Sequence, residues 1–166
     1  VVPDQIGTVS MAVYAAGVLD ATSVKVVFMV SDYNVALETL LAAKEALIGT
    51  HTKLIGSLFA DNLLYEGGID PDLMVKLSKE GQCDGFLIDT LVKDGRNLFD
   101  FITEAKLKEM VLRGKEMGMS TALSGHLKIS DLDELARVNP DIVGVRGAVC
   151  GDGDRGRSVA WEAVAE

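Results

Sequence analysis

The sequence predicts an α/β fold built on a parallel sheet, and three features of the chain point to it. Five short runs of apolar and β-branched residues alternate with stretches of helical periodicity. The starts of these runs lie roughly thirty residues apart, with a last gap nearer twenty, which is typical of βαβ units. The runs are apolar almost throughout, as expected for parallel strands covered by helices. An open doubly wound sheet and part of a (β/α)8 barrel both satisfy this pattern.

The clearest expected strand is the run VKVVFMV, which is dominated by residue types that favour strands. Four later runs have the same character but are shorter. The five expected strands are Val24–Val30, Leu54–Leu58, Gly85–Asp89, Ser120–Ser124 and Ile142–Arg146.

Helix signals fill the segments between the strands. Asp70 followed by Pro71 is typical of a helix N-cap and the first helical residue. Gly81 and Gly118 stand where a glycine often ends a helix. With the apolar periodicity, these signals predict helices at Thr8–Leu19, Tyr33–Leu47, Asp70–Lys79, Leu98–Met117, Ser130–Val138 and Ser158–Ala165.

The composition is that of one globular domain or part of one, with 166 residues of which 48% are hydrophobic. The formal net charge of −9 argues against binding to the phosphate backbone of nucleic acid. The longest uncharged apolar run, Val26–Val30, is too short to span a membrane, and no signal peptide is recognisable at Val1. Two cysteines form no disulfide framework, so we expect a cytoplasmic protein with no membrane or nucleic-acid partner.

Three successive strands are followed by ionisable residues and glycine, which turns and helix caps explain only in part. In the open sheet and in the barrel alike, ligands bind beyond the carboxyl ends of the parallel strands, so we expect the functional residues there. Asp89 ends the third strand and Lys93 follows four residues later, and a carboxylate beside an ammonium can relay protons. A surface ion pair or a turn cap explains the same spacing more simply. His126 follows the fourth strand, as a catalytic or a solvated loop residue.

Lys25 is the one charged residue inside the first strand, on the same face as Val27 and Met29. A buried lysine amine loses its proton more readily, which is how a lysine becomes a nucleophile or a proton shuttle. The alternative is a lysine near the start of a strand that extends its amine to solvent. The pattern alone leaves both interpretations open.

The segment Arg146–Gly156 is rich in glycine and carries two arginines, which predicts a phosphate-binding loop. It lacks the G-K-[ST] of a Walker loop, and no G-x-G-x-x-G follows a strand. No cluster of His, Cys and acidic residues has metal-ligand spacing. We therefore expect neither a metal nor another cofactor, and we interpret Cys150 as structural.

Several segments recur in the same order in one family of enzymes. The most specific are Leu98–Phe101 (LFDF) and Asp141–Ala148 (DIVGVRGA). The others are Gly7–Ser10, Val24–Val26, Cys83–Thr90, Lys93–Gly95, Cys150 and Gly153–Arg155. On these segments the chain resembles the (5-formylfuran-3-yl)methyl phosphate synthases of methanofuran biosynthesis, over essentially its whole length.

The resemblance implies a (β/α)8 TIM barrel, of which residues 1–166 form a single domain and supply about the last five β/α units. It also implies condensation of two molecules of a small phosphorylated aldehyde, glyceraldehyde 3-phosphate, with loss of phosphate and water. The implied mechanism is that of a class I aldolase, through a lysine Schiff base and without a metal. By position, Lys25 matches an active-site lysine in the barrel interior, and Asp89 and Lys93 match an acid–base pair after the sixth strand.

Two aldehyde phosphates also need two anion-binding regions. The barrel fold places Arg146 and Gly147 after the eighth strand, where such barrels hold phosphate. Together with Gly125, they are the expected phosphate-binding residues, near the positive starts of helices.

Part of the family pattern is absent from this chain. The family has roughly three more strands before the segment matching Gly7, and the second of them carries D-V-K-N-P, whose lysine is the favoured Schiff-base residue. Five strands cannot close an eight-stranded barrel. Either the protein extends before Val1, which is no initiator methionine, or a fragment needs a complement. Exposed sheet edges would favour pairing, and hence a homo-oligomer.

Two other interpretations remain open. The first is a non-catalytic, flavodoxin-like module of five strands that binds a phosphorylated effector or a partner protein. Strand order distinguishes it, because a barrel segment has the order 1-2-3-4-5 and the open fold has 2-1-3-4-5. The second is another barrel aldolase, or a synthase of the indole-glycerol-phosphate type, with different carbon substrates.

Overall fold

A computed structural model describes residues 5–29, 32–92, 94–151 and 156–165 of the chain. Strands and helices alternate along it, as the sequence predicts. The strands are β1 (Ser23–Phe28), β2 (Lys53–Phe59), β3 (Gly85–Asp89), β4 (Ser120–Ser124) and β5 (Ile142–Gly144). The helices are α1 (Ile6–Val18), α2 (Tyr33–Ala46), α3 (Met74–Glu80), α4 (Glu104–Glu116), α5 (Leu132–Val138) and α6 (Trp161–Ala165).

All five strands form one parallel sheet, and their order in the sheet is their order in the chain, β1-β2-β3-β4-β5. A flavodoxin-like sheet requires the first strand to lie between the second and the third. The flavodoxin-like alternative is therefore wrong for this chain. The observed order is the one expected of consecutive units of a barrel.

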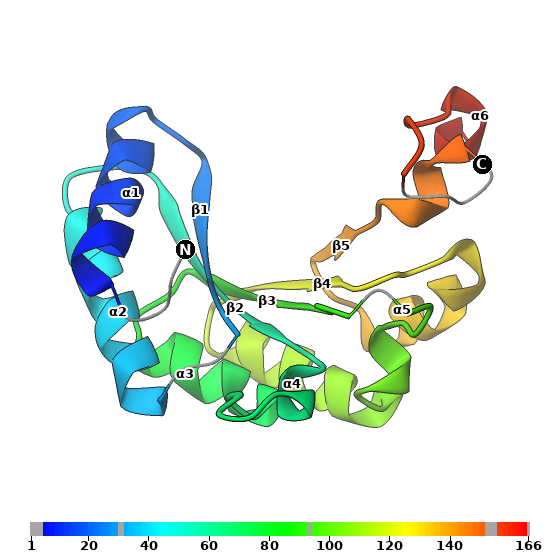
Figure 1. The fold of residues 1–166 in the computed structure, drawn as a ribbon, viewed down its shortest axis with the longest axis horizontal. Coiled ribbons are helices and arrows are strands. Elements are labelled where there is room, and N and C mark those ends of the chain that lie inside the picture. Colours follow the sequence, from blue (N-terminus) through cyan, green and yellow to red (C-terminus); the bar gives the residue numbers. More distant parts are fainter. Residues whose placement is uncertain (1–4, 30–31, 93, 152–155, 166) are drawn as a thin grey trace.

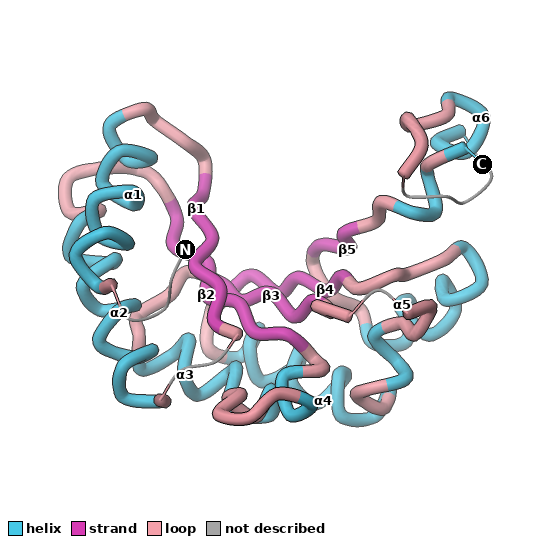
Figure 2. Tube along the Cα trace, in the orientation of Figure 1, coloured by secondary structure: helices cyan, strands magenta, loops and turns pink. Residues whose placement is uncertain are grey.

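The sheet is curved, and helices α1 to α5 cover its convex side (Figure 1). The opposite, concave side carries no helix of the described chain (Figure 1). The segment after β5, which includes α6, extends away from the other helices (Figure 2). Within the described ranges, every helix is too short or too polar to cross a membrane.

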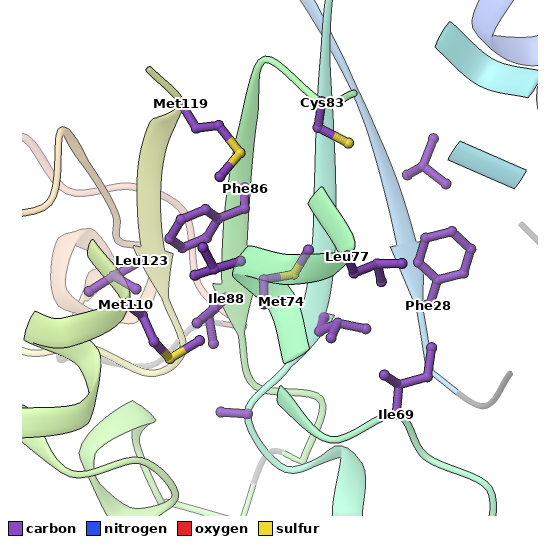
Figure 3. Packing of buried hydrophobic residues seen from close by; sticks show 14 of the residues in the cluster. Phe28, Ile69, Met74, Leu77, Cys83, Phe86, Ile88, Met110, Met119 and Leu123 are labelled. Carbon is purple, nitrogen blue, oxygen red and sulfur yellow. The ribbon is translucent and has the colours of Figure 1, made fainter. Parts of the chain in front are cut away.

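One row of buried side chains runs across the convex face. Phe28, Leu58, Ile88 and Leu123 are aligned by the strand register, and none is more than 1% exposed. Helix residues such as Met74, Leu77 and Met110 pack over these strands (Figure 3). Full burial of such a side chain contributes about 1.5–3 kcal/mol. This row therefore fixes the register and attaches the helices to one face.

The concave face is only partly covered. Lys25 is exposed and Val27 is half-buried, whereas their neighbours Val26 and Phe28 face the core and are buried. The interpretation of Lys25 as a buried lysine is therefore wrong for the described chain. Lys25 is exposed because it lines a hollow on the concave side, which carries no helix of the described chain (Figure 1).

The predicted helix Leu98–Met117 is two elements instead of one. A 3-10 turn covers Leu98–Asp100, and α4 begins only after Thr103, whose extended backbone and hydroxyl cap the helix. The Thr103 hydroxyl accepts a hydrogen bond from the Lys106 N–H at 3.4 Å. A second N-cap inside an apolar stretch thus divides it.

Gly118 has the left-handed φ expected after a helix, at +76°, but Gly81 does not, because Gln82 takes that conformation with φ +55°. Gly81 is required for a different reason. A Cβ at this position would lie 2.7 Å from Leu40 Cβ, so only glycine lets α2 and the end of α3 approach so closely.

Two aspartates, each directly before a strand, brace the amino end of the sheet. Asp84, before β3, accepts hydrogen bonds from the Leu54 N–H at 2.8 Å and from Lys44 Nζ at 2.7 Å. Asp141, before β5, accepts from the Thr121 N–H at 2.8 Å and pairs with Lys115 at 3.2 Å. Each carboxylate therefore ties a neighbouring strand to the helix that precedes that strand.

We predict that Asp84→Asn weakens the acid dependence of stability. Burial acts to raise the pKa of Asp84, but hydrogen bonds from Lys44 and Leu54 outweigh burial and hold it below its ordinary value of 3.8. A lowered folded-state pKa means stabilisation that is present above about pH 4 and lost as the pH falls through that pKa. Thermal unfolding followed by circular dichroism should show a Tm lowered by about 2–4 °C at neutral pH. It should also show a shallower loss of stability below about pH 4. An unchanged acid slope would contradict this account.

Candidate functional site

A cavity of about 230 Å³ opens at the carboxyl ends of β3, β4 and β5. Four of the six predicted site residues line it: Asp89, Gly125, Arg146 and Gly147. The remaining lining residues are Ser124, His126, Gly144 and Val145. Residues far apart in the sequence meet here because parallel strands in register end at one edge of the sheet.

Lys25 does not line this cavity. It lines a second hollow of about 480 Å³ on the concave face, and the two hollows share Asp89, Ser124 and Gly144. Through the strand register, Lys25 is level with Gly85, which precedes Asp89 by four positions. Four residues span about 13 Å along a strand. The structure thus places Lys25 on the same face as Asp89, but deeper along the strands.

Lys93, the sixth predicted site residue, lies outside the described residues, and so does Arg155 of the predicted phosphate-binding loop. The described parts of that loop are Arg146–Gly151 and Gly156. The geometry of the site therefore rests on the strand ends and on the residues next to them.

Asp89 is half-buried at the end of β3, and hydrogen bonds fix its backbone and side chain. Its Oδ1 accepts a hydrogen bond from the Thr90 N–H at 2.8 Å. Its carbonyl oxygen accepts another from the Ala60 N–H at 2.7 Å, beyond the end of β2. These bonds hold the carboxylate at the mouth of the cavity.

Gly125 brings the ends of β3 and β4 into contact. Its φ is +122°, and a Cβ there would lie 2.7 Å from Thr90 Cγ2 and 3.1 Å from the Thr90 nitrogen. Its carbonyl accepts a hydrogen bond from the Leu98 N–H at 3.0 Å. The next residue, His126, also has a positive φ, at +53°. The chain therefore turns sharply at the cavity, and only glycine allows so close an approach.

Arg146 supplies positive charge to the cavity. Its side chain is exposed, and none of the carboxylates in the described parts of the chain lies within ion-pair distance of it. A guanidinium with no carboxylate partner among the described residues, beside the backbone of Gly144 and Gly147, suits a phosphate or a carboxylate ligand.

Neither cysteine has the surroundings of a reactive thiol. Burial raises the pKa of Cys83 to about 12, so that the thiolate is scarce at neutral pH. Cys150 is 3% exposed. Across the part of the chain that the structure describes, no three His, Cys, Asp or Glu side chains are grouped to hold a metal ion.

Two residues near the site are not predicted from the sequence. Asp61 and Asn62 follow β2 at the same carboxyl edge and are almost wholly buried, at 1% and 0% exposure. The sequence predicts a strand at Leu54–Leu58, so Asp61 and Asn62 are expected in the exposed loop that follows it. The signal that could have found them is an Asp-Asn pair directly after an apolar strand, where polar residues are normally exposed.

The sequence pattern of one protein family, described as 4-HFC-P synthase, matches residues 2–166. The chain belongs to the 4-HFC-P synthase family. It is 37% identical over 157 residues to a (5-formylfuran-3-yl)methyl phosphate synthase of Methanococcus maripaludis strain C6, covering 93% of this chain and 66% of that protein. The protein of that name from Methanopyrus kandleri is 36% identical over 159 residues, covering 94% of this chain and 67% of that one.

This member of the 4-HFC-P synthase family thus spans about two thirds of the length of its curated relatives. A solved structure, DHDPS from Cyanidioschyzon merolae with lysine bound, superposes with a TM-score of 0.51 at 10% identity. The match covers 95% of this chain and 64% of that one. At so low an identity the likeness concerns only the fold, a barrel-like α/β arrangement.

We predict that Gly125→Ala is costlier than Gly118→Ala, although both positions have positive φ. Gly118 has open space around its missing Cβ, so alanine there should cost about 1 kcal/mol of unfolding free energy. At Gly125 the contact with Thr90 adds to the backbone strain, for a total of about 2–3 kcal/mol. Urea unfolding measures both values, and a smaller loss at Gly125 than at Gly118 would refute the close approach.

Proposed function

We propose that this chain is part of a (5-formylfuran-3-yl)methyl phosphate synthase, which condenses two molecules of glyceraldehyde 3-phosphate in methanofuran biosynthesis. One observation carries the proposal. Asp89, Gly125, Arg146 and Gly147, from the ends of three strands, line a single cavity in a chain of the family whose relatives bear this name. The cavity thus combines a carboxylate with an anion-binding guanidinium, as such a reaction requires.

We further propose that the five strands are the last five of a (β/α)8 barrel. The strand order and the single covered face support this, because each unit of a barrel follows its predecessor with its helix outside. Ile142 of β5 is 57% exposed, although barrel strands are buried on both faces. Three further β/α units would pair with β1 and β5 and would enclose the concave face.

In this proposal, Arg146, Gly147 and Gly125 bind the phosphate of one substrate molecule. A guanidinium can bind two phosphate oxygens at once, and glycine lets the phosphate approach the backbone. The bound phosphate would hold the three-carbon chain of the substrate in the cavity, within reach of the carboxylate of Asp89. The concave hollow, with Lys25, extends from this point into the interior of the proposed barrel.

The carbon chemistry needs an amine and a group that moves protons. The aldehyde of one substrate molecule reacts with a lysine amine to give an iminium ion and water. Loss of a proton from the next carbon gives an enamine, which attacks the aldehyde carbon of the second molecule. Asp89 with Lys93 is the proposed acid–base pair for the proton transfers, and Lys25 the proposed amine of the interior.

The overall reaction is balanced without an oxidant or a reductant. Two three-carbon aldehyde phosphates provide the six carbons of the product. Hydrolysis of the final imine frees the lysine, and net loss of one phosphate and two waters accounts for the remaining atoms. Each elimination needs a proton removed from carbon and another delivered to a leaving oxygen, which is the role proposed for Asp89 and Lys93.

In the full-length protein, we predict that Asp89→Asn lowers kcat by about 100-fold or more, because the amide cannot exchange protons. Lys93→Ala should have an effect of the same order. The matched control is Asp133→Asn, on the exposed surface of α5, which should retain wild-type turnover. The circular dichroism spectra should be unchanged. Wild-type turnover in Asp89→Asn would contradict the assignment.

We predict that Arg146→Ala chiefly raises KM for glyceraldehyde 3-phosphate, by about 10- to 100-fold, because a charge-assisted contact to phosphate is lost. Arg113→Ala, on the outer helix α4, removes the same charge far from the cavity and should leave KM unchanged. Equal effects of the two substitutions would show that Arg146 acts only through net charge.

The imine itself can be trapped. Borohydride added to the full-length protein with glyceraldehyde 3-phosphate should reduce the iminium ion to a stable amine and leave the substrate carbons attached to one lysine. Peptide mapping then identifies that lysine, whether Lys25 or one outside these 166 residues. The absence of any adduct during turnover would refute the Schiff-base mechanism.

A further inference from the structure

Asp61 is a buried carboxylate at the carboxyl edge of the sheet, two residues beyond the end of β2. Its side chain is 1% exposed. One oxygen accepts a hydrogen bond from the Leu91 N–H at 2.8 Å, and the other accepts from the Val92 N–H at 2.7 Å. Both oxygens are thus directed at the two successive peptide groups that follow Asp89-Thr90.

The same short segment joins three strand ends. The N–H of Ala60 donates to the Asp89 carbonyl at 2.7 Å. The amide nitrogen of Asn62 donates to the carbonyl of Ile69 at 3.1 Å and reaches that of Phe28, the last residue of β1, at 3.5 Å. The segment after β2 therefore ties the end of β1 to the loop that follows Asp89.

Asp61 differs from the two aspartates at the amino end of the sheet. Asp84 and Asp141 are partly exposed and each pairs with a lysine, as expected of stabilising contacts near the surface. Asp61 is desolvated, and its hydrogen-bond donors among the described residues are backbone N–H groups of one loop. A buried carboxylate is costly unless it is well hydrogen-bonded, and here the N–H groups of Leu91 and Val92 supply those hydrogen bonds.

Hydrogen bonds hold the three residues that directly follow Asp89. The Thr90 N–H binds the Asp89 carboxylate, and the next two N–H groups bind Asp61. Further along, Arg96 stacks over Phe101, with 4.6 Å between the guanidinium and the ring centroid. Without Asp61, the Leu91 and Val92 N–H groups would lose two charge-assisted hydrogen bonds, and these peptides could rotate.

We propose that Asp61 is a positioning residue for the acid–base group of the site. It fixes the Leu91 and Val92 peptides directly after Asp89-Thr90, and so holds the Asp89 carboxylate in the geometry needed for proton transfer. This inference rests on the proposed function, which makes Asp89 an acid–base group. It adds that proton transfer at Asp89 also requires Asp61, a buried residue that does not line the cavity.

The test is a double-mutant comparison in the full-length protein with glyceraldehyde 3-phosphate. The asparagine of Asp61→Asn has nearly the shape of aspartate, but its NH2 group replaces one of the two accepting oxygens. One loop N–H then faces a donor instead of an acceptor, so the loop should shift. We expect kcat to fall about 10- to 100-fold, with KM changed less than about twofold. If Asp61 acts through Asp89, Asp61→Asn should lower kcat no more than about twofold in the Asp89→Asn background.

The control is Asp84→Asn, which removes a carboxylate that also accepts from a backbone N–H, but at the amino end. It should leave the kcat of each background unchanged, although it lowers Tm. Amide hydrogen exchange should accelerate at Leu91 and Val92 in Asp61→Asn and remain unchanged there in Asp84→Asn. If Asp61→Asn does not fold, Asp61→Glu, whose oxygens lie one methylene further out, enters the same comparison.

The outcomes separate the two proposals. Wild-type kcat in folded Asp61→Asn, or an equal further loss in the Asp89→Asn background, overturns the positioning role alone. Absence of turnover of glyceraldehyde 3-phosphate by the unsubstituted full-length protein overturns the proposed function, whatever Asp61→Asn does. Wild-type kcat in Asp89→Asn overturns the acid–base role of Asp89 and, with it, the positioning role. A loss in Asp61→Asn that disappears in the Asp89→Asn background supports both.

Discussion

The architecture depends on the in-register pairing of parallel strands around one buried row, Phe28, Leu58, Ile88 and Leu123. A slip of one residue would turn these side chains to the open face, so the register is strongly specified. Because the strands run in one direction, the same register brings their carboxyl ends to one edge. Packing on the convex face therefore determines which loops meet at the cavity, although no residue of the row lines it.

The two ends of the sheet use charge differently. At the amino end, Asp84 and Asp141 meet lysines from the preceding helices, and their charges are matched. A larger hollow of about 630 Å³ also lies there, but its Lys44 is already paired with Asp84. At the carboxyl end, Arg146 has no carboxylate partner within the described residues. Stabilising contacts and the proposed binding groups thus occupy opposite edges, as in other parallel α/β proteins.

The sequence predicts much of this arrangement because it follows from local pattern. Apolar runs and the rule that parallel strands end at one edge predict the strands and the meeting of Asp89, Gly125 and Arg146. Two features could not be predicted in the same way. The exposure of Lys25 depends on what covers the concave face, and the role of Asp61 depends on N–H groups thirty residues away. Such contacts between distant loops leave no periodic signal in one sequence.

A crystal structure of the full-length protein with glyceraldehyde 3-phosphate bound would show directly whether the substrate binds in the cavity at the carboxyl ends of the strands. We expect the phosphate group within hydrogen-bond distance of the Arg146 guanidinium and the Gly147 N–H, with the carbon chain directed toward Asp89. Phosphate bound at the amino end, among Lys44, His51 and Lys53, with the carboxyl-end cavity empty, would contradict it.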